Sequence, residues 1–575
     1  MTRRICFSVV FACVCLIATS TSASTIVVND VGDGAADDGT CTLREALAAA
    51  SSNIASGGTP GECAAGEPLP VIDTIAFAIA GSGVRTIQPA SQIPPITESV
   101  VIDGYTQQGS LPNTLAIGDN AVLLIEIDCS LMPSNVDLFD FHTGESTVRG
   151  LVINRLQGTI MYFSAGNDNV IEGNFLATDP SGTTFLGSNA TAMRVDGARN
   201  RIGGTAPASR NVFAATGGSK TGTLMIQGSD NIVQGNYIGV DATGTAPLAN
   251  SGATNGIEVG LAGAATNTLI GGDSAGAGNV IVNNNISINL HGNGSRGATI
   301  QGNHIGVNAA GDATLGGGVL GIAAFIMPNV TIGGSTPGAG NVMAGYGNVI
   351  SIGESATNVV IQGNHIGTDA SGTRAIPNAG NGILVGAPGI GSMIGGTHPG
   401  EGNTIAYTCG EGVTFGGVDH WPILGNSIFG TRGLGISLLS PGTPTPNDAG
   451  DGDTGNNDQQ NYPVITSATI SNGTASITGT LDSTASTTFR IEFFANSACS
   501  RSGYGAGQTF IGTADVTTDL DGNASFGPLS FAAPDGADVT ATATDPDGDT
   551  SEFSECVGPH DHIFTGNFDA NCVDG

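Results

Sequence analysis

The sequence predicts an all-β protein whose main body is a parallel β-helix, preceded by a short N-terminal capping helix and followed by an immunoglobulin-like β-sandwich. Three observations lead to this fold class. Short apolar clusters alternate with Gly, Asn, Asp and Pro, Gly-Asn pairs recur at regular intervals, and the C-terminal part alternates apolar and polar residues. The 575 residues, with 91 glycines and 11% charged residues, indicate a long, turn-rich chain rather than one ordinary globular core.

The repeat is the most informative of these observations. Gly-Asn pairs lie 61 to 67 residues apart, and Ile-Gly-Gly elements and a third set of asparagines recur with them. The pairs begin at Gly173, Gly235, Gly302, Gly363 and Gly425, the Ile-Gly-Gly elements at Ile202, Ile270, Ile332 and Ile394, and the third set is Asn211, Asn279, Asn341 and Asn403. We interpret the unit as about 62 residues that form three coils of about 21 residues each, which is a solenoid period.

The apolar residues come in clusters of two to four between glycines, with no run at helical spacing, which excludes a helical solenoid. Short strands that turn at Gly and Asn fit a parallel β-helix over residues 101–439, with coils about 4.8 Å apart. The Gly-Asn asparagines are expected at turns, where their amides satisfy backbone groups or form a ladder along the stack, and a binding role is less favoured. They are Asn174, Asn236, Asn303, Asn364 and Asn426.

The N-terminus predicts export. Arg3 and Arg4 precede an apolar run that is short for a membrane span, and small residues follow, so residues 1–23 are expected to be a signal peptide rather than an anchor. No other stretch is long and apolar enough to cross a bilayer, so we expect a secreted or cell-surface protein that is not integral to the membrane.

A capping box, Thr42 with Glu45, predicts a short helix that covers the end of the stack. The less favoured alternative gives Arg44 and Glu45 a functional role.

Three motifs in this region carry a resemblance to a known family. The segments CTLREAL, Ile75-Ala76-Phe77 and VVIDGYTQQG resemble the CSLREA-type N-terminal module of secreted bacterial proteins and the coils that follow it. The resemblance implies a cap and first coils over residues 24–100 and a right-handed parallel β-helix of the pectate-lyase-like superfamily. That family is named by its fold and largely lacks an assigned activity.

The C-terminal part divides into three segments. Residues 440–461 are a Pro- and Asp-rich linker. Residues 462–557 suggest about seven short strands of a sandwich, and they resemble the bacterial immunoglobulin-like domains that follow such β-helices. Residues 558–575 resemble the aromatic-acidic tails of some secreted bacterial proteins, which implies a sorting signal.

The net charge of −33 restricts the partners. A surface this acidic repels nucleic acid, anionic membranes and polyanionic sugars, and is compatible with a neutral glycan, a cation or a basic partner.

Without the signal peptide, seven cysteines remain, and we expect the disulfides Cys41–Cys63 and Cys499–Cys556 because each pair lies within one module. Cys129, Cys409 and Cys572 are left over, and an odd count requires a free or intermolecular thiol.

Calcium is the one cofactor the sequence suggests. Closely spaced carboxylates on a flexible loop suit a hard cation, although neither candidate stretch completes a twelve-residue EF-hand loop. The alternative is a solvated acidic turn. The candidates are Asp448, Asp451, Asp453 and Asp458 in the linker and, less favoured, Asp545, Asp547 and Asp549 in the sandwich.

Other side chains could serve a glycan site. His420 and Trp421 could line a sugar-binding face, although packing of Trp421 is favoured. The repeated residues Asp179, Asp241 and Asp369 would lie three or more coils apart, at least about 14 Å, too far to act together in cleavage. The same distance would prevent His304 and His365, which occupy the same place in two repeats, from sharing a metal. Remaining candidates are Glu258, Glu354 and Glu411, and the basic group Arg194, Arg199, Arg201 and Arg210, as an anion site or, preferably, a solvated face.

These observations favour a secreted or cell-surface protein that binds a neutral polysaccharide or cell-surface glycan without catalysis. The alternative is a polysaccharide lyase or glycoside hydrolase of the pectate-lyase-like superfamily. A cluster of carboxylates or basic groups on adjacent coils of one face would distinguish an enzyme from a binding protein.

Overall fold

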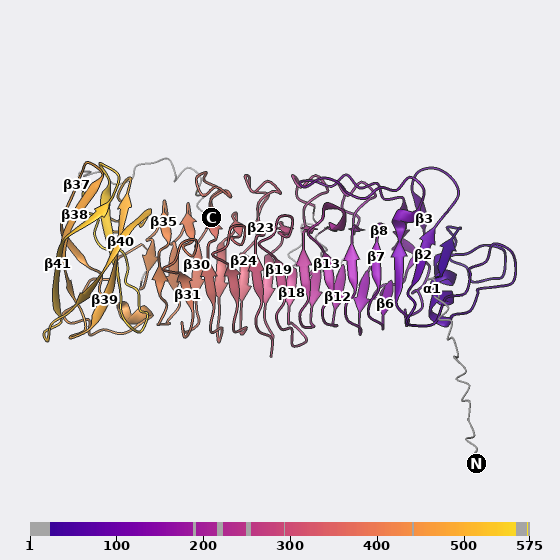
Figure 1. The fold of residues 1–575 in the computed structure, drawn as a ribbon, viewed down its shortest axis with the longest axis horizontal. Coiled ribbons are helices and arrows are strands. Elements are labelled where there is room, and N and C mark those ends of the chain that lie inside the picture. Colours follow the sequence, from indigo (N-terminus) through magenta and orange to yellow (C-terminus); the bar gives the residue numbers. More distant parts are fainter. Residues whose placement is uncertain are drawn as a thin grey trace, which may run out of the picture.

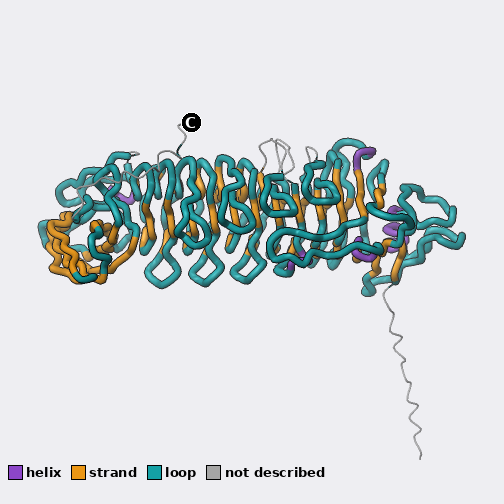
Figure 2. The backbone as a smooth tube through the Cα atoms, turned by 90° about the horizontal axis from the view of Figure 1, so that it is seen from above, coloured by secondary structure: helices purple, strands orange, loops and turns teal. Residues whose placement is uncertain are grey.

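The computed structural model describes residues 24–187, 191–214, 222–248, 255–292, 294–439, 442–558 and Cys572. The chain forms a long rod of stacked strands, with α1 (Leu43–Ser52) at its N-terminal end and an antiparallel β-structure at the other end (Figure 1). Loops project from the stacked strands along the length of the rod (Figure 2). The rod is a parallel β-helix, as predicted.

Three parallel sheets of 13, 12 and 11 strands run along the rod, and each coil from β4 onward contributes one strand to each. Sheet A contains β1 (Thr25–Val28), β2 (Asp73–Phe77), β4 (Val100–Asp103), β7 (Thr147–Arg149), β10 (Val170–Glu172), β13 (Arg201–Gly203), β16 (Ile232–Gln234), β19 (Leu269–Gly271), β22 (Thr299–Gln301), β25 (Thr331–Gly333), β28 (Val360–Gln362), β31 (Met393–Gly395) and β34 (Ile423–Leu424). Sheet B contains β3 (Arg85–Ile87), β5 (Ile125–Asp128), β8 (Leu151–Asn154), β11 (Phe175–Leu176), β14 (Val212–Phe213), β17 (Tyr237–Ile238), β20 (Val280–Ile281), β23 (His304–Ile305), β26 (Val342–Met343), β29 (His365–Ile366), β32 (Thr404–Ala406) and β35 (Ser427–Phe429). Sheet C contains β6 (Phe139–Phe141), β9 (Met161–Phe163), β12 (Met193–Val195), β15 (Leu224–Ile226), β18 (Asn255–Val259), β21 (Ile286–Leu290), β24 (Leu320–Ala324), β27 (Asn348–Ile352), β30 (Ile383–Val385), β33 (Val413–Phe415) and β36 (Ile436–Ser437).

The register corrects the predicted coil length. Ile171 pairs with Ile202, and Ile202 pairs with Val233, so these coils contain 31 residues by subtraction. The 62-residue unit is therefore two coils, not three. The Gly-Asn and Ile-Gly-Gly elements occupy the same corner between sheets A and B in alternate coils. Gly-Asn forms a tight turn there, and Ile-Gly-Gly begins a longer loop.

The interior of the rod is dry, because one apolar side chain of nearly every strand points inward and is fully buried. At the A–B corner, nine asparagines form a ladder in which each side-chain Nδ2 donates to the Oδ1 of the next at 2.9–3.1 Å. They are Asn174, Asn211, Asn236, Asn279, Asn303, Asn341, Asn364, Asn403 and Asn426. The turn and ladder role predicted for the five Gly-Asn asparagines is confirmed, and the third set of asparagines shares it.

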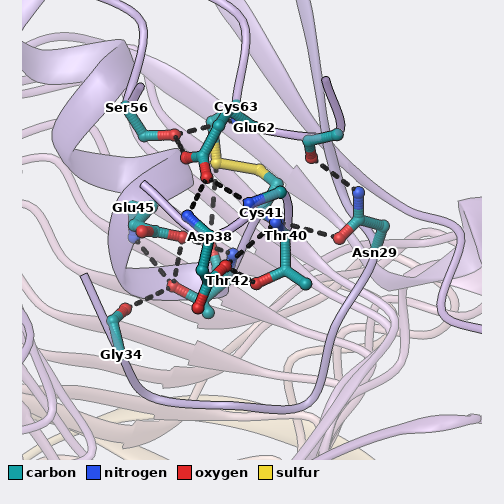
Figure 3. The surroundings of a disulfide bond; sticks show 12 residues. Asn29, Gly34, Asp38, Thr40, Cys41, Thr42, Glu45, Ser56, Glu62 and Cys63 are labelled. Carbon is teal, nitrogen blue, oxygen red and sulfur yellow. Dashed lines mark hydrogen bonds between the residues drawn. A yellow bond between two sulfur atoms is a disulfide. The ribbon is translucent and has the colours of Figure 1, made fainter. Parts of the chain in front are cut away.

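The helix α1 begins where the sequence predicts. Thr42 caps it, and the reciprocal bonds of the capping box with Glu45 are both present. The disulfide between Cys41 and Cys63 joins the start of this helix to the following loop (Figure 3). Arg44 pairs with Asp33 at 2.8 Å and donates to the carbonyl of Gln92, so it holds the N-terminal loops together. The short 3₁₀ segments are η1 (Gly104–Thr106), η2 (Cys129–Leu131), η3 (Pro207–Ser209) and η4 (Asn456–Gln459).

The C-terminal part contains two three-stranded antiparallel sheets rather than about seven strands. They are β37 (Val464–Ser471), β38 (Thr474–Asp482) and β41 (Asn523–Ala532), and β40 (Thr509–Thr517), β39 (Thr488–Asn496) and β42 (Asp538–Thr544). The described part of the expected linker packs against both neighbours. Its Asn457 is fully buried and donates to the carbonyls of Trp421 and Thr550.

The cysteines follow the expected pairs and add one. Cys499 and Cys556 form a disulfide, and so do Cys409 and Cys572, which sequence reasoning left unassigned. Cys129 is a free, buried thiol. The signal peptide and, apart from Cys572, residues 559–575 of the tail lie outside the described residues. No helix in the described part of the chain is long and apolar enough to span a membrane.

Candidate functional site

The outer face of sheet C is where the coils differ most from one another. Its strands are in register, so outward side chains form two columns along the rod. The first column reads Asp140, Tyr162, Arg194, Met225, Glu258, Asn289, Ala323, Ser351, Leu384 and Thr414, and the second, two residues further along, reads His142, Ser164, Asp196, Gln227, Gly260, His291, Phe325, Gly353, Gly386 and Gly416. Ionisable side chains occur only over the first six of these coils.

The first three of these coils form a partly exposed cluster, here called the sheet C patch: Asp140, His142, Tyr162, Ser164, Arg194 and Asp196. Arg194 binds Asp196 through two nitrogens, each at 2.9 Å, and its guanidinium lies 5.0 Å from the Tyr162 ring centre. The Tyr162 hydroxyl donates to Asp196 at 2.9 Å. The patch is accessible, because the Arg194 and Asp196 side chains are 37% and 23% exposed.

Asp140 occupies the other end of the patch. It accepts from Ser164 Oγ at 2.9 Å and lies 2.9 Å from His142 Nε2.

The hydrogen bond from Arg194 to Asp196 raises the pKa of Arg194. Partial burial, together with the hydrogen bond to Asp196, raises the pKa of Tyr162. The patch therefore presents a neutral phenol and a permanent cation beside two carboxylates.

The patch brings together carboxylates on strands that are two apart in sheet C. At about 4.8 Å per strand, the two strands lie about 9.6 Å apart along the rod. Asp196 is also two residues further along its strand than Arg194, which is the position equivalent to Asp140, so the two carboxylate positions are more than about 9.6 Å apart. Inverting glycosidases hold their two carboxylates about 6.5–9.5 Å apart, with space between them for a water. Side chains of the intervening strand, Tyr162 and Ser164, occupy that space and bind both carboxylates.

Sequence reasoning identified Arg194 in this patch and missed the other five residues. The available signal was the shared apolar–polar–apolar–polar pattern of Phe139–His142, Met161–Ser164 and Met193–Asp196. It becomes visible only when the sequence is aligned by single coils. Glu258 lies further along the same column. It is almost fully buried and binds His291 Nε2 at 2.6 Å.

The linker aspartates form a second candidate site. One carboxylate oxygen from each of Asp448, Asp451 and Asp453 lies within 4.8 Å of the others, whereas Asp458 is not part of this cluster. Burial, with the neighbouring charges of Asp453 and Asp448, raises the pKa of Asp451 to about 6. One oxygen of Asp448 and one of Asp453 are buried without a hydrogen-bond partner among the described residues.

The sandwich aspartates have structural roles instead. Asp545 accepts from the backbone N–H groups of Gly548 and Asp549, and Asp547 is exposed. Asp549 binds the backbone and ring of His420, at 2.6 and 2.9 Å. Burial opposes protonation of His420, but the hydrogen bond and charge of Asp549 outweigh it and raise its pKa. The aspartates do not converge on a shared point.

Trp421 is fully buried, and its indole N–H donates to the carbonyl of Ala387 at 2.7 Å. A ring without an exposed face cannot stack on a sugar, so the sugar-binding role considered for Trp421 is wrong and the packing alternative holds. His420 is 39% exposed but held by Asp549.

The repeated aspartates are turn residues. Asp179, Asp241 and Asp369 each accept from backbone N–H groups four and five residues later, and Asn308 does the same in the third repeat. The predicted separation of at least 14 Å is wrong, because successive hairpins are two coils apart, which is about 9.6 Å. Successive hairpins also contact each other: the backbone N–H of Ala242 donates to the carbonyl of Gly182 at 2.9 Å, and that of Ala309 donates to the carbonyl of Gly244 at 3.0 Å.

The remaining sequence candidates are dispersed. Glu354 is exposed on a turn, and Glu411 is buried and accepts from the backbone of Gly442. The four arginines do not form one cluster. Arg199 pairs with Asp168, Arg201 pairs with Glu172, and Arg210 stacks over Tyr237 at the A–B corner.

No known protein family and no curated protein matches the sequence. Among solved structures, the chain is similar to the full-length tailspike protein 2 of the Escherichia coli O157:H7 bacteriophage CAB120, at 10% identity and a TM-score of 0.25, over 86% of this chain and 68% of that chain. It is also similar to a tailspike protein of the Acinetobacter baumannii bacteriophage Fri1, a capsular polysaccharide depolymerase, at 10% identity and a TM-score of 0.17, over 85% of this chain and 81% of that chain. Similarity at this level carries no information about function.

Proposed function

We propose that the chain is a secreted or cell-surface β-helix protein that binds an uncharged glycan through the sheet C patch without cleaving it. The observation that carries the proposal is the partly exposed group of Tyr162, Arg194, Asp196 and Asp140 on three successive coils. Beyond β21, the same face carries Ala, Ser, Leu, Thr, Gly and one Phe. An aromatic ring among charged hydrogen-bonding groups suits a sugar ring, which has apolar faces and hydroxyl edges.

The hydrogen bonds of the patch favour binding over cleavage. A glycosidase requires one carboxylic acid that carries a proton for the leaving group. Both oxygens of Asp196 accept from Arg194, and one also accepts from Tyr162. Asp140 is bound by Ser164 and His142. Each carboxylate is thus already used as an acceptor.

A glycan array tests this proposal. The full chain is expected to bind at least one uncharged glycan, and Tyr162→Ala or Arg194→Ala should weaken that binding at least tenfold, because each removes a central contact. Arg199→Ala is the matched control, since its exposed ion pair with Asp168 lies outside the patch. Binding that is equally strong in the patch variants would refute the role of the patch.

Glycoside hydrolysis or polysaccharide lysis is the second candidate. It is supported by Asp140, Arg194 and Asp196 on neighbouring coils of one face, which is the kind of cluster that the sequence analysis expects of an enzyme. Release of reducing ends or unsaturated products from a polysaccharide panel would support it. Turnover that survives Asp140→Asn and Asp196→Asn would place the active site elsewhere.

We also propose that Asp448, Asp451 and Asp453 bind calcium. Three converging carboxylates, two of them with a buried oxygen that has no donor among the described residues, suit a hard cation. Asp458 would not be a direct ligand in this arrangement. The role of this site would be structural, since it lies in the segment between the rod and the sandwich.

The domain assignments remain part of this proposal. The capping box and the Cys41–Cys63 disulfide support a CSLREA-type module over residues 24–100. Two packed antiparallel sheets support an immunoglobulin-like domain over residues 462–557. Three disulfides among the described residues support an oxidising, extracellular location.

A further inference from the structure

A groove runs along the outer face of sheet B. Its floor is the column of outward side chains in register, Tyr237, Val280, His304, Val342 and His365. One wall is formed by the longer corner loops 272–278 and 334–340, and the other by the hairpins that Val307–Thr314 and Thr368–Ala375 close. We call this the sheet B groove.

Two hollows make the groove continuous. One has a volume of about 280 Å³ and the next about 450 Å³, and both are lined by Gly302, His304 and Gly338. The wall loops of alternate coils contact each other, with Thr336 Oγ1 donating to Asp273 at 3.2 Å. The groove is thus a built feature of the rod rather than a gap between loops.

The described lining of the larger hollow contains no Asp, Glu, Lys or Arg, on a chain with a net charge of −33, whereas the smaller hollow is also lined by Arg210 and Asp273. The described lining of the larger hollow consists of glycines with Ser335, Thr336, Pro337, Val342 and Ala370, and the two histidines. Burial lowers the pKa of both His304 and His365. At neutral pH each imidazole is therefore uncharged, with one N–H donor and one acceptor nitrogen.

One polar atom of the groove floor lacks a hydrogen-bond partner among the described residues. His365 Nδ1 is buried and has no hydrogen bond among the described residues. Gly372 of the wall hairpin lies against this edge of the ring, so the part of the imidazole that lines the hollow is not Nδ1.

The spacing of the groove indicates the shape of its ligand. His304 and His365 occupy equivalent positions two strands apart in sheet B, so the groove repeats about every 9.6 Å. A polymer that makes the same contacts with both histidines must have a repeating unit of about this length. An extended linear polysaccharide with a disaccharide repeat has this property.

We propose that the sheet B groove binds a linear, uncharged polysaccharide in an extended conformation, with one disaccharide for each pair of coils. This surface is separate from the sheet C patch, and the proposal does not depend on that patch. The imidazoles of His304 and His365 and the polar groups of the wall loops bond the sugar hydroxyls, above the buried Val280 and Val342.

Calorimetry with oligomers of increasing length from a linear, uncharged β-linked glucan tests the groove. Affinity should rise in steps of two sugars. Ala370→Trp fills the larger hollow from an exposed turn and should weaken binding at least tenfold, whereas Ala375→Trp, on the same hairpin but outside the lining, should not. A single-sugar dependence, equal binding of a polyuronate, or an unchanged affinity in Ala370→Trp would each overturn the proposal.

The histidines provide an independent test that does not depend on filling the hollow. His365→Leu should weaken binding, and His365→Gln, which keeps a donor and an acceptor, should retain more of it. The exposed His398→Leu is the control. Tyr162→Ala separates the two surfaces, because loss of binding in that variant alone assigns the ligand to the sheet C patch and overturns the groove.

Discussion

At the scale of single residues, the asparagine ladder shows how one side chain solves a recurrent problem. Each corner between sheets A and B leaves backbone groups that the strands cannot pair. Asn303 Nδ2 donates to the carbonyls of Ile270 and Gln301 and to Asn341 Oδ1, all at 3.0 Å. Its Oδ1 accepts from the backbone and side chain of Asn279. Every coil from Asn174 to Asn426 therefore depends on the same kind of amide.

We expect Asn303→Ala to destabilise the protein by about 1–3 kcal/mol, because it leaves buried partners unsatisfied. Asn303→Asp should be more destabilising, since a carboxylate would face three acceptor oxygens. Denaturant unfolding of both variants measures this order. An aspartate variant more stable than the alanine variant would contradict the donor role of the Asn303 amide.

At the scale of elements, the sequence predicted the strands, the turns and the solenoid, but it did not predict the number of residues in one coil. Strands of two or three residues, such as His304–Ile305, carry too little pattern to be counted, so a 62-residue repeat was divided into three coils rather than two. The same error separated Phe139–His142 from Met161–Ser164, which are adjacent in space. The disulfides Cys41–Cys63 and Cys499–Cys556 were predictable because each lies within one module, whereas Cys409–Cys572 spans 163 residues.

The linker segment offers a prediction at this scale. Millimolar calcium should raise the melting temperature, because binding to the folded state alone stabilises it. Asp451→Asn should abolish the shift, whereas Asp458→Asn, outside the cluster, should keep it. Protons compete for the ligands, so calcium affinity should fall as pH drops through about 6, the value to which burial raises the pKa of Asp451. If calcium does not raise the melting temperature of the unaltered protein, the calcium proposal is wrong.

At the scale of the whole molecule, buried carboxylates connect the rod to its C-terminal sandwich. Glu552 accepts from the backbone N–H groups of Leu438 and Thr445, both at 2.7 Å, and Glu492 accepts from that of Gly425 at 2.8 Å. These bonds cross between the last coils and the antiparallel sheets. Burial raises the pKa of both glutamates above their ordinary value of 4.5.

The raised pKa values predict how stability depends on pH. The folded state binds these protons more tightly than the unfolded state, so their contribution is complete below about 4.5 and is lost as pH rises through the folded pKa. We therefore expect the melting temperature to rise as pH falls from 7.5 towards 5. Glu552→Gln, which mimics the protonated acid, should reduce this slope. Glu555→Gln is the matched control, because it removes the same charge from an exposed position. Equal slopes in the two variants would show that the overall negative charge, rather than the buried Glu552, sets the pH dependence.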